Sequence, residues 1–412
     1  MSQTLLEADE PAGGLFIPNT VKAAERWVGE RIRQGRPFLI RGNSSSSCRD
    51  PYENSSLKTG QLSTRKLRKT LFFDPDDMVA GVEAGKTILE LQKLLAKKGM
   101  LLPVNPWYPD STLGGMVSAN VCGPNRMDMG GLRDFLIGIE YINGTGERVH
   151  AGGKVVKNVT GYDLTRMMIG HLGGLGLITS VNFKVQPFPV EPHGIYLETK
   201  GTEWRETVEK LRHMRIPLDW IQAVSSKPKG NGFLLGLGFS GNTERRGRIS
   251  SEINTAFGGT PFMLPDGEMS TVWPFLPGQS RFSGFLPAFL EHWGMPQPGL
   301  HVLANLTTSS ILELPLEKLK NWEPRMIVHP VGSDIHFFLK DPEAASQKMF
   351  LETLCRILNI PGANLRLVRA SEGCGPNVLG PFGKPPGYSI TQRLKRHLDP
   401  HGIFHSPFYE ME

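Results

Sequence analysis

Hydrophobic residues recur at helical spacing in some segments of this chain and form short apolar runs in others. Val21, Ala24, Val28 and Ile32 recur every three or four residues, which predicts a helix over 19–34. A capping box of Thr87 and Glu90 predicts the start of a second helix. Short apolar runs between polar residues or glycine predict strands at 37–40, 78–84, 135–141 and 177–185.

Beyond residue 195 the pattern repeats itself. Strand and helix spacings follow the same order in 194–257 and in 301–368, on either side of a proline-rich connection at 261–298. This repetition predicts two rounds of an α+β unit around antiparallel strands. The proline pair Pro187 and Pro189 predicts the boundary before it.

Composition and charge limit the class of protein. The 412 residues are 39% hydrophobic and 21% charged, which excludes an intrinsically disordered chain. The net charge of +6 is spread along the chain, whereas nucleic-acid binders concentrate basic residues on one face, so we expect no nucleic-acid partner. No apolar window reaches the roughly twenty residues that cross a bilayer, and no leader peptide is visible, so we expect a cytoplasmic protein.

The four cysteines give no sign of a metal site. Cys48, Cys122, Cys355 and Cys374 lie far apart and contain no C-x-x-C pair. This spacing indicates neither a zinc site nor an iron–sulfur cluster. We therefore expect no metal in this chain.

Two runs of small residues carry the clearest chemical signal. The run from Asp110 to Gly123 is rich in glycine and hydroxyl side chains, and Gly42–Ser47 is a second run that also follows a predicted strand. Without bulky side chains, main-chain N–H groups can come within hydrogen-bonding distance of a pyrophosphate. Two such loops that converge can hold a pyrophosphate from both sides. The alternative is a tight turn packed against a helix.

In these two loops the chain resembles the flavin-binding domain of the vanillyl-alcohol oxidase (PCMH-type) superfamily. Within it, the chain is similar to the FAD-binding subunits of bacterial glycolate oxidases. Three further motifs and a C-terminal element occur in the family's order, at 133–146, 156–164, 173–179 and 394–404. The resemblance is specific over 36–190 and 389–407 and weak across 195–380.

The resemblance implies an α+β fold in three parts. A PCMH-type FAD-binding domain made of two α+β subdomains is expected over 1–190. An α+β cap domain with an antiparallel sheet, facing substrate or partner, is expected over 191–388. A C-terminal helix and tail, 389–412, are expected to return to the FAD-binding domain.

The resemblance also implies non-covalent FAD, because the first loop has no histidine for a covalent link. Both loops would line the diphosphate and ribityl chain, a turn would lie near the cofactor, and a third segment would lie beside the adenosine. The residues at these positions are Gly42, Asn43, Ser44, Ser45, Ser46 and Ser47; Asp110, Ser111, Thr112, Leu113, Gly114, Gly115, Ser118 and Gly123; Asn158, Gly161, Tyr162 and Asp163; and Gly176 and Ile178.

Two positions depart from the family pattern. The first loop is rich in serine where the family has more glycine, so a loop position that needs positive φ would be strained. In the closing element His405 follows Phe404, where the family usually has asparagine. An imidazole at this position can still form a hydrogen bond near the flavin ring.

No catalytic residue is assigned from the sequence. His301, His329 and His336 lie on predicted strands of the cap, and imidazole suits proton abstraction, although strand histidines are more often structural. Arg366 and Arg369 can hold a substrate carboxylate or lie at the surface. Trp107 and Tyr108 can pack on the flavin or fill a corner of the core, and His171 and Cys374 are interpreted as loop residues.

Two functions follow from the resemblance. The first is an FAD-dependent oxidoreductase component that oxidises a small 2-hydroxy acid, such as glycolate or D-lactate, and passes electrons to a partner. A larger flavoprotein subunit and a separate iron–sulfur subunit are the expected partners, and they can place the chain peripherally at a membrane. The alternative is a non-catalytic subunit, FAD-carrying or structural, that stabilises a catalytic paralogue.

Overall fold

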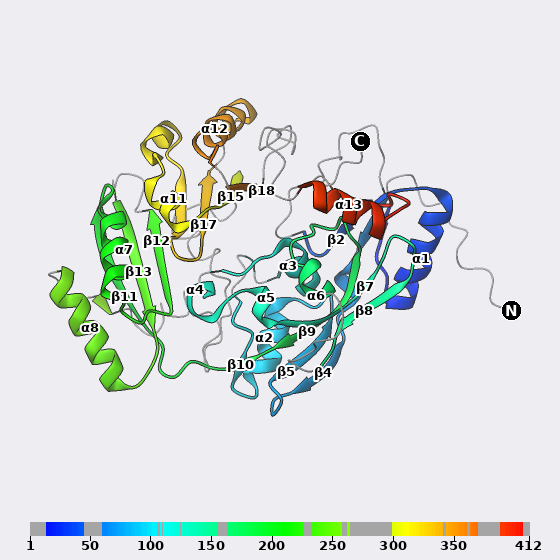
Figure 1. Cartoon of the computed structure of the whole chain (residues 1–412), viewed down its shortest axis with the longest axis horizontal. Coiled ribbons are helices and arrows are strands. Elements are labelled where there is room, and N and C mark those ends of the chain that lie inside the picture. The colour runs from blue at the N-terminus through cyan, green and yellow to red at the C-terminus, as the bar shows by residue number, and fades with distance from the viewer. Residues whose placement is uncertain are drawn as a thin grey trace.

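The computed structural model places two sheet systems side by side (Figure 1). One system uses residues 15–187 together with 404–405, and the other uses residues 193–369. The division at residues 190 and 388 stays a prediction. The structure describes residues 14–44, 60–104, 108, 110–123, 125–154, 163–225, 232–257, 262–263, 299–340, 343–360, 363–369 and 388–406.

The first subdomain is a small parallel sheet covered by one helix. The helix, α1, begins where the Thr20 hydroxyl accepts from the Ala23 N–H and ends at Gly35 in the left-handed region. Trp27 of α1 packs edge-on against Phe38, with ring centroids 4.8 Å apart. The elements are α1 (Val21–Gln34) and a sheet in the order β1 (Leu15–Phe16), β3 (Gly60–Ser63), β2 (Phe38–Arg41) and β19 (Phe404–His405).

The second subdomain is an antiparallel sheet with short helices packed on it. Its sheet has the order β4 (Thr70–Asp74), β5 (Val79–Glu83), β9 (Leu177–Lys184), β7 (Leu136–Ile142) and β8 (Arg148–Gly152). A separate ladder joins β6 (Met100–Leu101) to β10 (Gln186–Pro187). The helices are α2 (Ile88–Ala96), α3 (Leu113–Ala119), α4 (Arg126–Met129), α5 (Leu132–Phe135) and α6 (Leu164–Met167).

Helix α3 corrects the sequence analysis, which treated 110–123 as a loop. Its N-cap is Thr112, whose hydroxyl accepts from the Gly115 N–H, and Asn120 ends it in the left-handed region. Met116 and Val117 are buried in the core of this subdomain. The cap and the burial of one face outweigh the low helix propensity of two glycines.

The predicted repeat in the second half is confirmed by the order of the eight-stranded sheet. The order is β14-β11-β13-β12 followed by β16-β17-β15-β18, so the second unit mirrors the first across the β12–β16 pair. The first unit consists of β11 (His193–Lys200), α7 (Glu203–Met214), β12 (Trp220–Ser225), β13 (Gly232–Phe239), α8 (Thr243–Phe257) and β14 (Phe262–Met263).

The second unit departs from the prediction between its first two strands. The repeat predicts one helix between these strands, but an α-helix followed by a 3-10 helix lies there. The unit consists of β15 (Leu300–Asn305), α11 (Thr308–Glu313), η2 (Leu316–Trp322), β16 (Arg325–His329), β17 (Asp334–Leu339), α12 (Ala344–Ile357) and β18 (Asn364–Arg369).

The eight-stranded sheet has two different faces because side chains alternate along each strand. One face packs against its helices as a separate apolar core. On the other face five apolar residues join the core of the second subdomain, namely Val224, Leu303, Ile327, Phe338 and Val368. This shared core joins the sheet directly to the second subdomain.

The C-terminal helix α13 (Tyr388–Leu398) returns to the first part of the chain through a buried ion pair. Lys395 pairs with Asp399 and donates to the carbonyls of Gly174 and Phe404. The Asp399 carboxylate accepts from the main-chain N–H groups of Ile403 and Phe404, at 3.0 and 2.9 Å. The pair therefore ties α13 both to β19 and to the Gly170–Gly176 loop.

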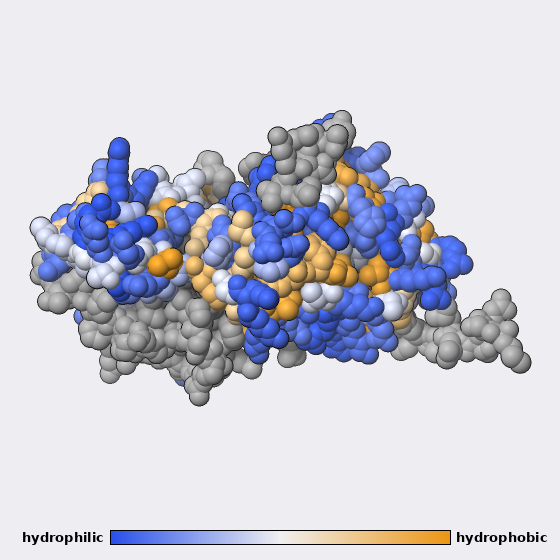
Figure 2. Space-filling view, turned by 90° about the horizontal axis from the view of Figure 1, so that it is seen from below, coloured by the Kyte–Doolittle hydropathy of each residue, from blue (hydrophilic) through white to orange (hydrophobic). Residues whose placement is uncertain are grey.

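Seen from below, hydrophilic residues cover much of the described part of that face, and apolar residues gather near its middle (Figure 2). Among the described helices, none combines the length and the apolar character that crossing a bilayer needs.

The buried ion pair predicts a stability test. Lys395→Met leaves the buried Asp399 carboxylate without its cation, which costs on the order of 3–5 kcal/mol when one partner of such a pair is removed. We expect a lower midpoint in chemical unfolding of the full chain. Arg396→Met, at an exposed position of the same helix, is the control and should stay within about 0.5 kcal/mol. Equal midpoints for the two variants would contradict this role of Lys395.

Candidate functional site

A pocket lies where the loop after β2, helix α3 and the segment before β9 meet. Side chains and main chain from these three segments line it, together with Thr64 from the short 3-10 helix that follows β3. The lining residues are Ile40, Arg41, Gly42, Asn43, Ser44, Thr64, Ser111, Thr112, Gly114, Gly115, Ser118, Ala119, His171, Leu172, Gly173, Gly176 and Ile178.

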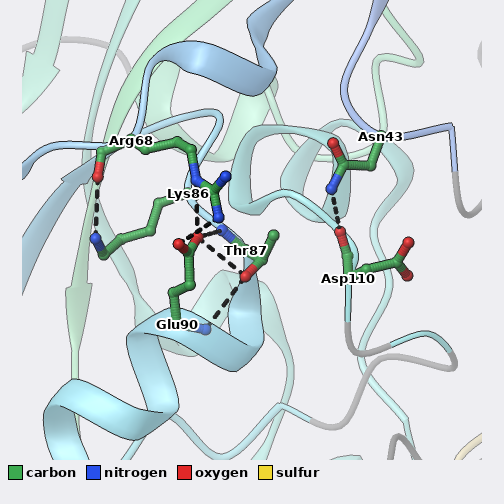
Figure 3. Close-up of polar contacts among 6 residues, drawn as sticks. All are labelled: Asn43, Arg68, Lys86, Thr87, Glu90 and Asp110. Atoms are coloured by element: carbon green, nitrogen blue, oxygen red, sulfur yellow. Dashed lines mark hydrogen bonds and ion pairs between the residues drawn. The ribbon is translucent and has the colours of Figure 1, made fainter.

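The two predicted loops do converge, and they touch each other. A Cβ at Gly42 would lie 2.0 Å from the Thr112 hydroxyl, so only glycine allows this approach. The Asn43 side chain points at the second loop and donates to the carbonyl of Asp110 at 2.8 Å (Figure 3). These contacts hold one loop against the N-terminus of α3.

The third wall of the pocket is held against the other end of α3. The Ser118 hydroxyl accepts from the Gly173 N–H at 3.0 Å, and the Ser118 carbonyl accepts from the Leu172 N–H at 2.9 Å. Leu172 has a φ of 50°, in the region that favours glycine. A strained residue at a pocket wall is a feature of ligand sites.

The predicted grip by bare main chain is wrong for the first turn of α3. The Leu113 and Gly114 N–H groups donate to the carbonyls of Lys86 and Ala84, at 2.9 and 2.8 Å. The Gly115 N–H has the longer bond of 3.3 Å to its cap, Thr112. This part of the pocket is a floor without side chains. In the first loop, by contrast, no hydrogen bond from the main-chain N–H groups of 42–44 to another residue is found among the described residues.

The start of helix α2 supports α3 from below. Thr87 forms an isolated bridge with Thr112 and the predicted capping box with Glu90, so the two helix starts are joined. Arg68 pairs with the Glu90 carboxylate (Figure 3). Burial raises the pKa of Glu90, but the hydrogen bonds from Thr87 and the pairing with Arg68 outweigh it and hold the pKa below its ordinary value.

The predicted cofactor residues fall into three groups. Ten line the pocket: Gly42, Asn43, Ser44, Ser111, Thr112, Gly114, Gly115, Ser118, Gly176 and Ile178. Four are described but do not line it: Asp110, whose carbonyl holds Asn43; Leu113, in the core; Gly123; and Asp163, the N-cap of α6. Six lie outside the described residues: Ser45, Ser46, Ser47, Asn158, Gly161 and Tyr162.

The serine-rich first loop carries the strain expected of it. Ser44 has a φ of 56°, in the left-handed region that glycine adopts without strain. The sequence analysis did not foresee Arg41, Thr64 and His171 as pocket residues. For Arg41, its place at the end of a predicted strand, next to the first loop, could have indicated a pocket residue.

A second group of polar side chains is buried on the cap sheet, on the face that packs against the second subdomain. The His301 Nε2 and His336 Nδ1 atoms lie 3.0 Å apart, and His329 bonds to Asp334. The Tyr108 hydroxyl lies 3.5 Å from the His301 Nδ1 atom. The three histidines are at most 2% exposed. A continuous polar network thus crosses strands β15, β16 and β17.

Asp334 is the charge at the centre of this network. Burial raises its pKa, but the paired imidazoles of His329 and His336 outweigh that effect and hold the pKa well below its usual range. The ligand atoms of these three residues all lie within 4.8 Å of one another, a spacing that suits a divalent cation. The sequence predicted no metal site, and that stays a prediction.

Arg366 brings the network close to the pocket. It lies on β18, and its guanidinium donates to the carbonyl of Ala119, a pocket residue at the end of α3. Arg366 is partly buried on the edge strand of the sheet, and both alternatives given for it stay predictions. Trp107 and Cys374, named as candidates above, lie outside the described residues, as does the side chain of Arg369.

Comparison with known proteins shows which proteins this chain is similar to. Residues 12–152 match the family model of the FAD binding domain. The chain is 36% identical over 197 residues to the glycolate oxidase subunit GlcE of Escherichia coli, which covers 47% of this chain and 55% of that protein. It is 34% identical over 128 residues to a D-lactate dehydrogenase of Anaerostipes hadrus, 31% of this chain and 27% of that protein.

The fold as a whole is similar to that of alkyldihydroxyacetonephosphate synthase. The TM-score is 0.67 at 16% identity, covering 95% of this chain and 76% of that one. The matched segments span about half the length or less of the curated relatives. The chain carries an FAD-binding domain of the PCMH-type superfamily, followed by an α+β cap, and is related to glycolate oxidase subunits and D-lactate dehydrogenases.

The floor of the pocket predicts how FAD content responds to one substitution. A Cβ at Gly115 would meet only the Thr112 hydroxyl, at 2.9 Å, so a larger side chain projects into the pocket without clashing with the core. Gly115→Val should lower the FAD content of the purified chain at least about tenfold. The measurement is absorbance of released flavin per protein.

The control for this substitution is Gly247→Val, an exposed helix position in α8 with open space around it. It should leave FAD content unchanged. Circular dichroism should show the same helix content in both variants. Full flavin occupancy in Gly115→Val would contradict the placement of FAD on this floor.

Proposed function

We propose that this chain is the FAD-binding component of a dehydrogenase that oxidises a small 2-hydroxy acid of the glycolate or D-lactate type. The observation that carries the proposal is the buried His–Asp network of the cap beside a pocket built for a dinucleotide. By their names, one relative is a subunit of a glycolate oxidase and the other is a D-lactate dehydrogenase, and glycolate and D-lactate are both 2-hydroxy acids. The redox chemistry belongs to the cofactor.

The pocket residues fit FAD by shape and by donor type. Gly115 leaves space at the pocket floor, Gly42 allows the first loop to approach Thr112, and Arg41 offers positive charge beside them. The main chain of the first loop, including the region of Ser44, would hold the diphosphate, and the walls at Ser118 and Ile178 would hold the ribityl and adenosine parts. Bound flavin would accept a hydride from the substrate carbon.

The buried network would accept the proton of the substrate hydroxyl. Burial lowers the pKa of His336 despite the opposing effect of Asp334, so this imidazole is neutral near pH 7 and has a lone pair to offer. His301 lies between His336 and Tyr108 and can pass a proton along the chain of hydrogen bonds. The Asp334 carboxylate stabilises the imidazolium that forms.

A partner role is part of the proposal. The chain holds its flavin but contains no cysteine cluster for an iron–sulfur centre, so electrons would leave through another polypeptide. We propose a larger flavoprotein subunit and a separate iron–sulfur subunit as partners, in the cytoplasm or at the membrane surface. Co-purification with endogenous partners, followed by flavin quantification, tests this arrangement.

The visible spectrum of the purified chain tests the proposed activity. We expect flavin bands near equimolar occupancy that bleach when glycolate or D-lactate is added without oxygen. An L-2-hydroxy acid and a simple alcohol serve as matched controls and should bleach more slowly. A sugar or aldehyde that bleached the flavin faster than either acid would contradict the substrate class.

The alternative function is a non-catalytic FAD-carrying or structural subunit. It is favoured by one observation, the near-complete burial of the three histidines, which leaves no open route to them in this conformation. Bands that no 2-hydroxy acid bleaches would support a carrier, and a colourless, folded protein would support a scaffold. The same spectrum thus separates the two functions.

The network predicts the effect of removing its charge. Asp334→Asn keeps the shape but loses the carboxylate that stabilises a protonated imidazole, so flavin reduction by substrate should slow at least about 10²-fold. FAD content and the thermal midpoint are measured alongside. Asp76→Asn, at an exposed turn, is the control. An unchanged reduction rate in Asp334→Asn, with FAD bound, would exclude the network from catalysis.

A further inference from the structure

His171 is a pocket residue whose polar atoms are only partly used by the protein. It belongs to the loop before β9, lines the pocket and is 2% exposed. Its Nδ1 atom accepts from the Leu175 N–H at 3.3 Å. Its Nε2 atom is buried and has no hydrogen-bond partner among the described residues. The sequence analysis read it only as a loop residue.

The hydrogen bond from Leu175 determines the tautomer of this ring. Because Nδ1 accepts this hydrogen bond, it carries no proton. A neutral imidazole then holds its single N–H proton on Nε2. Burial, together with the nearby Lys395 ammonium, lowers the pKa of His171 to about 3. The ring therefore stays neutral across the pH range in which the protein is handled, with Nε2 as a donor.

A buried donor without an acceptor is rare in folded proteins, because such groups lose water and gain nothing in return. The wall that holds His171 is itself firmly placed. Ser118 bonds to the main chain of Leu172 and Gly173, and Lys395 holds the carbonyl of Gly174. The loop thus keeps the imidazole at the pocket wall, and no described residue accepts a hydrogen bond from its Nε2 donor.

We propose that His171 binds FAD, donating a hydrogen bond from its Nε2–H group to an oxygen of the diphosphate–ribityl part. This inference rests on the proposed function, which puts FAD in this pocket. A neutral N–H donor suits such an oxygen. His171 is a binding residue in this proposal and takes no part in proton transfer.

Two substitutions separate this role from a purely structural one. His171→Asn keeps an acceptor near the position of Nδ1, for the Leu175 N–H, and removes the donor at the position of Nε2. His171→Gln places an amide N–H near the position of Nε2 and removes the acceptor near Nδ1. FAD is stripped from each full-length protein, and the affinity for added FAD is measured by flavin fluorescence. His397→Asn, at an exposed position of α13, is the control.

We expect His171→Asn to weaken FAD binding about tenfold, the loss of one hydrogen bond to a ligand. His171→Gln should stay within about threefold of the unsubstituted chain. The thermal midpoint of the FAD-free protein should be unchanged in His171→Asn. Weaker binding in both variants, with unchanged midpoints, also supports the proposal, because then only the imidazole places the donor correctly.

Several results would overturn the proposal. Normal FAD affinity in His171→Asn would show that the Nε2 donor does not bind FAD. Weaker FAD binding in His171→Gln alone would show that His171 acts through its hydrogen bond with the Leu175 N–H. A lowered FAD-free midpoint in both variants assigns it to folding. If the unsubstituted chain itself binds no FAD, the proposed function fails, and that failure is visible before any variant is compared.

Discussion

The close approach of helix α3 to the end of strand β5 is the constraint on which the pocket depends. A Cβ at Gly114 would lie 2.8 Å from the Ala84 Cβ, and the Gly114 N–H donates to the Ala84 carbonyl at 2.8 Å. Any side chain at this position would push α3 outward. Because α3 contacts the first loop through Thr112 and the Gly170–Gly176 loop through Ser118, its displacement would open both walls at once.

The cap contributes its polar network through one face of its sheet. Alternation along the strands places apolar residues such as Leu303 and Phe338 on the same face as His301 and His336. The apolar residues bury this face against the second subdomain, and burial removes water from the polar network. In such surroundings hydrogen bonds and the charge of Asp334 act strongly, and an unpaired group would be costly. The polar network of the proposed function and the packing between the domains therefore lie on one surface.

Much of the local structure could be predicted from the sequence, and the exceptions have physical reasons. Helix α1 and the capping box of α2 depend on residues within a few positions of one another, so periodicity and caps located them. Helix α3 was missed because its glycines suggest a loop, while the burial of Met116 and the cap at Thr112 depend on the fold. The short strands β3 and β4 were missed because they are held by partners distant in the chain.

The sequence by itself indicated an FAD-binding domain, through its resemblance to a known family, and a repeated α+β unit in the second half, through local periodicity. That two small-residue segments hold FAD stays a prediction. Only the tertiary structure decided that first-turn N–H groups of α3 are already used by the protein. It also decided that His301, His336 and Asp334 meet, because strand order brings β15 beside β17. Contacts between residues far apart in the chain depend on strand pairing, which no local pattern records.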